Sequence, residues 1–259
     1  MSHSGAVLIL SSLVSASQVG GGYQAATLAT LGFEAILAPT VLFGRHPGLG
    51  PPGGGAVADD LFEGIVTGIA ATGAFSSLTA CITGYFATKG QAAIAARAID
   101  SIRAVNARAQ VVVDPIMGDH ETGLYISAET AAAITAELVA RADLATPNSW
   151  ELSRLTGVGV DDPESAVRAA RRLGLPVLVS SVPVGDAIGV VFADKRAAWL
   201  ASHPRSLSAP KGTGDLLTAR YLAASLAGAP PAEALERAVA AVAEVVLGAP
   251  VQVRFEALA

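Results

Sequence analysis

Short apolar runs rich in Val, Ile and Leu alternate along the chain with longer Ala-rich stretches whose apolar residues recur at helical spacing. The expected strands are residues 6–11, 35–39, 80–83, 110–113, 143–145 and 177–180. The expected helices are residues 23–31, 91–105, 128–140, 163–173, 214–226 and 232–247. Such alternation is typical of parallel or mostly parallel sheets covered by helices. The pattern therefore predicts an α/β fold with a mostly parallel central sheet.

Two segments depart from this alternation. Residues 188–192 and 197–201 flank the turn Asp194-Lys195 and are expected to form an antiparallel hairpin. The segment from Thr40 to Gly55 is rich in Gly and Pro and has few apolar side chains with which to pack. We interpret it as a mobile flap, and a passive surface loop is an equally good alternative on composition alone.

Composition limits the classes of protein that fit. The chain has 259 residues, of which 52% are hydrophobic and 15% charged, so it can bury a large core, and we expect one domain over residues 1–259. The apolar runs are strand-length, much shorter than the roughly 20 residues of a membrane-spanning helix. The net charge is −5 and the basic residues are spread along the chain, which argues against nucleic acid as a partner.

The N-terminus and the cysteine content bear on the compartment. Residues 1–5 lack the basic region and cleavage pattern of a signal peptide. Cys81 is the single cysteine, so no intramolecular disulfide can form, and we read it as a small core residue. Both observations favour a cytoplasmic protein.

The sharpest chemical feature is the string Gly212-Thr213-Gly214-Asp215, which runs directly into an apolar helical pattern. Glycines at a helix start let backbone N–H groups converge on an anion, and the helix dipole adds positive potential. An aspartate in such a site can accept the proton of an attacking hydroxyl during phosphoryl transfer. The alternative is an ordinary capped helix start.

Asp114 follows the expected strand 110–113 and lies at the edge of the sheet where ligands of open α/β folds bind. A carboxylate there can serve Mg²⁺, which prefers one or two carboxylates together with phosphate oxygens. The alternative is an ordinary turn, because Asp-Pro is a common turn starter.

Asn148 and Glu151 follow the expected strand 143–145, three positions apart at a helix start, so both lie on one face of the first turn. A capping box explains this pair without any function. Three such polar residues at strand ends, together with the glycine-rich helix start, are harder to dismiss and indicate a phosphate-handling site.

These motifs, in this order and over nearly the whole chain, resemble the ribokinase-like superfamily, and specifically its vitamin kinase branch. The N-terminal third is most similar to the pyridoxal kinases. The matching stretches are Ser11-Ser12, the glycine turn at Val19-Gly20, residues 31–33, 39–42 and 46–50, and Thr83 to Phe86.

The resemblance implies a three-layer ribokinase-like fold with a flap over the substrate site. It implies an enzyme that moves the γ-phosphoryl group of ATP to the 5′-hydroxymethyl group of pyridoxal, forming pyridoxal 5′-phosphate in vitamin B6 salvage. It also implies Mg²⁺, leaves a monovalent cation open, and implies a homodimer. The alternatives are a kinase for hydroxymethylpyrimidine or another heterocyclic alcohol, and a non-catalytic ligand-binding protein that keeps the fold.

The resemblance also implies roles for individual residues on the acceptor side. Ser12 would contact the pyridine ring, and His46, Pro47 and Gly48 would close over it. Asp215 would deprotonate the hydroxymethyl group. The anion hole would be formed by Gly212, Thr213 and Gly214.

On the nucleotide side, the resemblance implies that Asp114, Asn148 and Glu151 serve the Mg-ATP phosphates, with Asp114 and Glu151 closest to the metal. Ser180, Ser181 and Thr213 would approach the nucleotide. One departure is Gly20-Gly21-Gly22-Tyr23, which stands where pyridoxal kinases usually have a Gly-Asn pair and which we expect to form a turn before the first helix.

Overall fold

The computed structural model describes residues 5–206 and 208–258, which form two compact units. The first unit comprises Met1–Met117 and Leu124–Asp143, and the second comprises Gly118–Gly123 and Leu144–Ala259. The expectation about a signal peptide falls mainly on residues 1–4, which lie outside the described residues.

The first unit is built on parallel strands. Its strands are β1 (Ala6–Val14), β2 (Glu34–Phe43), β3 (Gly54–Ala56), β4 (Leu78–Thr83) and β5 (Gln110–Val113). They lie in the order β5-β4-β1-β2-β3, and all neighbours pair in parallel except β3, which is antiparallel to β2. Residues 6–12 of β1 are all buried, as the continuous apolar run predicts for a central parallel strand.

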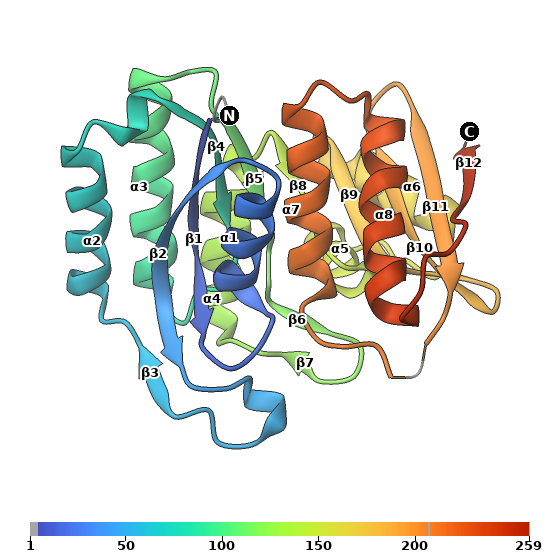
Figure 1. Ribbon diagram of the computed structural model, residues 1–259, viewed down its shortest axis with the longest axis horizontal. Helices are drawn as coiled ribbons and strands as arrows, with labels where there is room; N and C mark the ends of the chain where they lie inside the picture. Colours follow the sequence, from blue (N-terminus) through green and yellow to red (C-terminus); the bar gives the residue numbers. More distant parts are fainter. Residues whose placement is uncertain (1–4, 207, 259) are drawn as a thin grey trace. The chain divides into compact units, whose positions relative to one another are not determined.

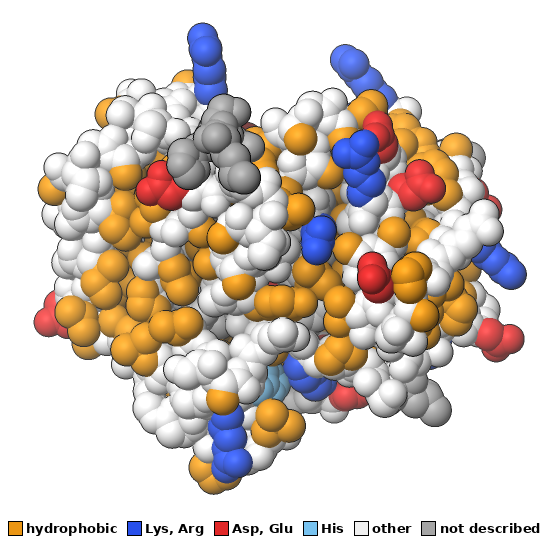
Figure 2. Space-filling model, in the orientation of Figure 1, with side chains coloured by type: hydrophobic (Ala, Val, Ile, Leu, Met, Phe, Trp, Pro, Cys, Tyr) orange, Lys and Arg blue, Asp and Glu red, His pale blue; other side chains and the backbone are white. Residues whose placement is uncertain are grey.

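The helices of the first unit are α1 (Gly20–Thr30), α2 (Asp59–Ala71), α3 (Lys89–Val105) and α4 (Ala128–Ala133), with short turns η1 (Pro47–Leu49) and η2 (Ala74–Ser76). Helix α1 packs on β1 and β2 (Figure 1). Helix α2 buries Phe62 and Val66 but leaves Leu61 58% exposed. Hydrophobic side chains gather on the face in Figure 2 over the region where Figure 1 draws α2 and β2.

The helix expected at residues 128–140 is not continuous. After α4 the chain continues as a π-helical turn, η3 (Ile134–Leu138), and a 3-10 turn, η4 (Val139–Arg141). Thr135 donates its hydroxyl proton to the carbonyl of Ala131 at 2.9 Å, a side-chain bond of the kind that bends helices. The prediction of one regular helix over residues 128–140 was therefore wrong from residue 134 onward.

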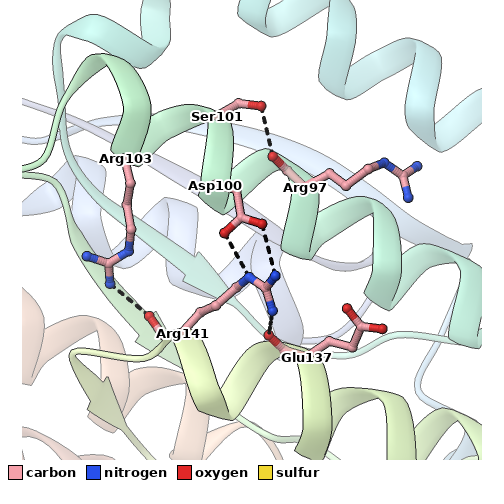
Figure 3. A network of polar contacts seen from close by, with 6 residues as sticks. All are labelled: Arg97, Asp100, Ser101, Arg103, Glu137 and Arg141. Carbon is pink, nitrogen blue, oxygen red and sulfur yellow. Dashed lines mark hydrogen bonds and ion pairs between the residues drawn. The ribbon is translucent and has the colours of Figure 1, made fainter.

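Arg141 fastens the end of this segment to α3. Its guanidinium donates to both carboxylate oxygens of Asp100, at 2.8 and 2.9 Å, and to the carbonyl of Glu137 at 2.6 Å (Figure 3). The bond from Arg141 lowers the pKa of the Asp100 carboxyl group. Because the Asp100 side chain is 55% exposed, we expect this ion pair to contribute no more than about 1 kcal/mol of stability.

The second unit combines one parallel strand pair with an antiparallel meander. Its strands are β6 (Gly118–Asp119), β8 (Leu144–Ala145), β9 (Val177–Val184), β10 (Ala187–Ala193), β11 (Ala198–Pro204) and β12 (Arg254–Leu258), and β7 (Gly123–Leu124) begins in it. Strand β8 pairs in parallel with β9, whereas each of the pairs β9–β10, β10–β11 and β11–β12 is antiparallel. The hairpin expected around Asp194-Lys195 is confirmed as β10 and β11.

The helices of the second unit are α5 (Ser149–Thr156), α6 (Pro163–Leu173), α7 (Thr213–Leu226) and α8 (Pro231–Leu247). Helices α7 and α8 lie side by side on the near face of its strands in Figure 1, and α5 and α6 lie behind them. A core of Val, Ala and Leu side chains forms between α5, α6 and strands β9 to β11. The predicted class, an α/β fold with a mostly parallel sheet flanked by helices, is confirmed.

Of the helices in the described part of the chain, none is both long and apolar enough to cross a membrane.

Cys81 lies in the middle of β4 with no exposed surface, and burial raises the pKa of its thiol to about 12. We expect a thiol reagent to leave it unmodified in the native protein from pH 7 to 9, since only the thiolate reacts. Full modification is expected once the chain is unfolded in denaturant. The control is an Ala71→Cys variant, whose new thiol lies at the exposed end of α2 and should be labelled at one site per chain in the native protein. Labelling of the native wild-type protein at a similar rate would contradict the prediction.

Candidate active site

The glycine turn at residues 212–214 opens onto α7, as the sequence predicts. Gly212 precedes the helix with φ +89°, a conformation that side chains other than glycine rarely adopt. The first intrahelical bond joins the N–H of Leu216 to the carbonyl of Gly212 at 3.0 Å. The backbone N–H groups before Leu216 therefore point beyond the helix start, the arrangement that binds anions.

Asp215 is the third residue of α7 and is 8% exposed. The cap position belongs to Gly212, which has no side chain, so Asp215 is not the N-cap residue of α7. A Cβ atom built on Gly214 would meet nothing within 4 Å, so open space adjoins this first turn. A phosphoryl group has room beside the backbone here.

A pair of buried hydroxyl groups ties α7 to the end of β8. Thr218 lies one turn after Asp215, and its Oγ1 is 3.1 Å from Oγ1 of Thr146. Both threonines are at most 5% exposed. The bond fixes the turn that carries Asp215 against the strand that leads into Asn148.

Asn148 and Glu151 form the predicted capping box at the start of α5. The Asn148 side chain accepts from the N–H of Glu151 at 2.9 Å, and the Glu151 carboxylate accepts from the N–H of Asn148 at 2.8 Å. Both side chains also hold Gly118: the Asn148 amide donates to its carbonyl at 2.8 Å, and Glu151 accepts from its N–H at 3.3 Å. The structural alternative is therefore confirmed, and the pair also clamps the start of β6.

Ser180 and Ser181 lie in β9 at an irregularity of its pairing with β10. The N–H of Ser180 donates to the carbonyl of Pro147 at 3.0 Å, next to Asn148. Ser181 has φ +60°, in the left-handed region. The structure thus brings both serines to the segment that carries Asn148.

Asp114 directly follows β5 and is 6% exposed. Its N–H donates to the carbonyl of Thr83 at 2.9 Å, and its own carbonyl accepts from the N–H of Ile116 at 2.9 Å. The carboxylate is thus carried by a tight turn at the carboxyl end of a buried parallel strand, as predicted.

Ser12 lies near the end of β1, 7% exposed, where the register between β1 and β2 shifts. A Cβ atom on Gly20 would lie 2.0 Å from the Ser12 hydroxyl oxygen and 3.0 Å from its carbonyl oxygen, so the start of α1 lies directly against Ser12. The prediction that all three glycines, Gly20, Gly21 and Gly22, precede the helix was wrong, although Gly20 itself has φ +67°, as a turn residue does. The three glycines are the first three residues of α1, because tertiary contact outweighs the low helix propensity of glycine.

The segment from Thr40 to Gly55 is a hairpin rather than an unstructured loop. Strand β3 pairs with the end of β2, and the N–H groups of Gly44 and Arg45 both donate to the carbonyl of Pro52. Arg45 Nε also donates to the carbonyl of Pro51 at 2.9 Å. A few backbone bonds thus hold the segment as a hairpin, its side chains are mostly exposed, and its interpretation as a mobile flap stays a prediction.

His46, Pro47 and Gly48 form the tip of this hairpin. The N–H of Gly48 donates to Nδ1 of His46 at 3.0 Å, and the N–H of His46 donates to the hydroxyl of Ser17 at 3.1 Å. At the base, the buried amide of Gln91 donates to two backbone carbonyls, Thr40 at 2.8 Å and Val57 at 2.7 Å. The hairpin is thus anchored at its base and carries the predicted acceptor-side residues at its tip.

The chemistry of the carboxylates fits a nucleotide-bound magnesium ion better than a metal held by protein alone. Among residues 5–206 and 208–258, no three His, Cys, Asp or Glu side chains form a metal-holding cluster. Mg²⁺ with phosphates needs only one or two carboxylates. Asp114 is a buried carboxylate at a strand end, and Glu151 is a buried carboxylate in the capping box of α5.

Three residues that shape these sites were not singled out from the sequence, Gln91, Ser149 and Thr218, and the contact of Gly20 with Ser12 was not expected. Gly20 was assigned to a turn, and the position of Ser12 against it depends on chain segments that fold together. Ser149 and Thr218 act through bonds to residues 32 and 72 positions away. Nothing in the local sequence marks such bonds.

Comparison with known proteins indicates the family to which the chain belongs. Residues 71–254 match the family model described as phosphomethylpyrimidine kinase. A pyridoxine/pyridoxal/pyridoxamine kinase of Bordetella avium is 39% identical over 243 residues, covering 91% of this chain and 81% of that protein. A pyridoxal kinase of Leifsonia xyli is 31% identical, covering 84% of this chain and 80% of that protein.

The chain is also similar to solved structures of pyridoxal kinases. Pyridoxal kinase from Entamoeba histolytica is 25% identical with a TM-score of 0.88, covering 96% of this chain and 91% of that chain. Pyridoxal kinase from Leishmania donovani, in complex with ADP and pyridoxine, is 26% identical with a TM-score of 0.87, covering 94% of this chain and 86% of that one. The chain therefore belongs to the pyridoxal kinase family and has its ribokinase-like fold.

Proposed function

We propose that this protein transfers the γ-phosphoryl group of ATP to the 5′-hydroxymethyl group of pyridoxal, forming pyridoxal 5′-phosphate in vitamin B6 salvage. The observation that carries the proposal is the position of Asp215, buried in the first turn of a helix whose cap is a glycine. The names of the Bordetella avium and Leifsonia xyli relatives support pyridoxal as the acceptor.

The start of α7 supplies the chemistry. Its N–H groups and dipole stabilise the negative charge on the phosphoryl group in transit, which is the largest contribution expected in phosphoryl transfer. Asp215 takes the hydroxymethyl proton as the acceptor oxygen bonds to the γ-phosphorus and the bond to the ADP oxygen breaks. When bound, Mg²⁺ neutralises part of the charge on the nucleotide phosphates.

The remaining residues bind and orient the two substrates. On the acceptor side, Ser12 contacts the pyridine ring, and His46, Pro47 and Gly48 close over it. On the nucleotide side, the proposed contacts are made by Asp114, Asn148, Glu151, Ser180, Ser181 and Thr213. The capping bonds of Asn148 and Glu151 support their role at the nucleotide, because these bonds hold both side chains, and with them the backbone of Gly118, in fixed positions.

The direct test is ATP turnover by the purified protein with a panel of acceptors. Pyridoxal, pyridoxine and pyridoxamine are compared with hydroxymethylpyrimidine, because the matching family model is named for phosphomethylpyrimidine kinase. Preferred turnover of pyridoxal supports the proposal. Preference for the pyrimidine would replace the acceptor, and binding of both ligands without any turnover would point to the non-catalytic alternative.

We further propose that the whole chain acts as one kinase domain and that it forms a homodimer in the cytoplasm. The Bordetella avium kinase matches this chain across both units, which supports a single domain. The exposed side chains of Leu42 and Leu61, 49% and 58% exposed, support an apolar contact surface. Light scattering that gave the mass of one chain at micromolar concentration would exclude the dimer.

Binding of both substrates should slow hydrogen exchange in the tip of the hairpin, residues 44–53. We expect this because its side chains are exposed and its order depends on a few backbone bonds. Amides near Thr40 and Val57, whose carbonyls Gln91 holds, should already be protected in the free protein. Exchange is measured by mass spectrometry with and without ligands.

The control is the tight turn that begins at Asp194, which joins β10 to β11 and lies outside the proposed substrate site. Its exchange should not change on binding. Equal protection of residues 44–53 with and without both ligands would remove hairpin closure from the mechanism.

A further inference from the structure

The end of β9 adopts a backbone conformation that an ordinary strand does not. Across residues 5–206 and 208–258, Ser181 is the only residue other than glycine with a positive φ, at +60°. The strand register confirms a bulge: Val179 pairs with Val191 and Val182 pairs with Gly189, so Ser180 and Ser181 together face a single residue of β10. A left-handed serine is unfavourable, so other contacts must hold it.

The side chain of Ser149 makes such a contact. Its hydroxyl donates to the carbonyl oxygen of Ser181 at 3.1 Å, and Ser149 is only 1% exposed. Its oxygen also lies 3.4 Å from Nε2 of His120, in the turn after β6. Because the single hydroxyl proton goes to Ser181, the His120 nitrogen is the donor in that second pair.

Helix capping does not account for this hydroxyl. Ser149 is the first residue of α5, and the capping box of that helix is complete with Asn148 and Glu151. A buried hydroxyl is unfavourable unless it is hydrogen-bonded, and the bond it makes here is to the carbonyl of the strained residue. The hydroxyl of Ser149 therefore acts on the bulge rather than on its own helix.

We propose that Ser149 is a positioning residue of the nucleotide site. Its hydroxyl holds the carbonyl of Ser181, keeps the bulge in its left-handed conformation, and so fixes Ser180 and Ser181 where the adenine nucleotide binds. From the other side, the N–H of Ser180 is tied to the carbonyl of Pro147, immediately before the capping box. This inference rests on the proposed function, in which both serines approach ATP.

The test is a double-mutant cycle. Ser149→Ala removes the hydroxyl, and Ser181→Gly makes the left-handed conformation accessible without the clamp. We expect Ser149→Ala to raise the KM for ATP about 3- to 10-fold, the loss expected for one hydrogen bond, with the KM for pyridoxal changed by less than about twofold. In the Ser181→Gly background the same substitution should raise the KM for ATP by less than about twofold.

Ser153→Ala is the matched control. It removes a hydroxyl from the same helix, one turn on, where it donates to the carbonyl of Ser149 at 2.8 Å and makes no bond to the bulge. Its KM values should match wild type. A purely structural role for Ser149 predicts a lower melting temperature with unchanged KM for ATP. That result would overturn the proposal. So would an equal rise in the KM for ATP and for pyridoxal, or an undiminished rise in the KM for ATP when Ser149→Ala is made in the Ser181→Gly background.

Binding of the ATP analogue AMP-PCP, measured by calorimetry, separates this inference from the proposed function. If wild type binds the analogue but does not phosphorylate pyridoxal, and Ser149→Ala weakens binding about 3- to 10-fold, the function fails while the inference stands. If wild type phosphorylates pyridoxal but Ser149→Ala binds the analogue as wild type does, the inference fails alone. If wild type does not bind the analogue, both fail.

Discussion

Asp215→Asn is expected to lower the turnover number for pyridoxal by roughly 10²- to 10⁴-fold, the usual contribution of a general base. The amide cannot accept the hydroxymethyl proton, whereas its size leaves the packing of α7 unchanged. The affinity for ATP should stay the same or improve, because a negative charge leaves the anion site at the helix start. Steady-state kinetics together with calorimetric titration of AMP-PCP measure both quantities.

Glu233→Gln provides the control for charge removal alone. Glu233 is the third residue of α8, as Asp215 is of α7, but it is exposed and forms an ion pair with Arg237. Losing the charge there should cost less than about 1 kcal/mol of stability and leave turnover unchanged. If Asp215→Asn keeps turnover within a few-fold of wild type, Asp215 acts only on the helix dipole and is not the base.

The parts of the fold that could be predicted are those whose sequence pattern matches their burial. Strand β5 and helix α6 have the expected bounds, because one ends in three consecutive buried valines and the other starts at a proline that follows the capping residue Asp162. Helix α2 was missed, since Gly64 and Gly68 lower its helix propensity and no side chain caps it. Strand β12 was missed because all but its last residue are exposed, so no alternation marks it.

The candidate site likewise contains residues that the sequence reveals and residues that it does not. The glycine turn, Asp215 and the capping pair could be found because each is a short string whose residues act on their own neighbours. Their partners could not, since Gly118 is 30 positions from Asn148 and Ser181 is 32 from Ser149. Such bonds follow from strand order and register, which a local pattern does not specify.

Gly20→Ala is expected to reduce kcat/KM for pyridoxal on the order of 10²-fold, the effect of misplacing a substrate contact by about 1 Å. A methyl group there would lie 2.0 Å from the Ser12 hydroxyl oxygen and 3.0 Å from its carbonyl oxygen. The hydroxyl could turn away, but the carbonyl belongs to the backbone of β1 and cannot move without the strand. Gly20 also has φ +67°, which adds strain of roughly 1–3 kcal/mol for alanine.

Gly22→Ala is the matched control two residues later in the same helix. Its Cβ atom would meet only the tip of the Leu13 side chain, at 3.0 Å, and no positive φ opposes it. Alanine there should raise stability by about 0.5–1 kcal/mol and leave the kinetics close to wild type. The effect of Gly20→Ala should fall on the acceptor, with the KM for ATP unchanged, because Ser12 is proposed to contact the pyridine ring. Equal kinetics in the two variants, measured with both substrates, would mean that Ser12 does not position pyridoxal.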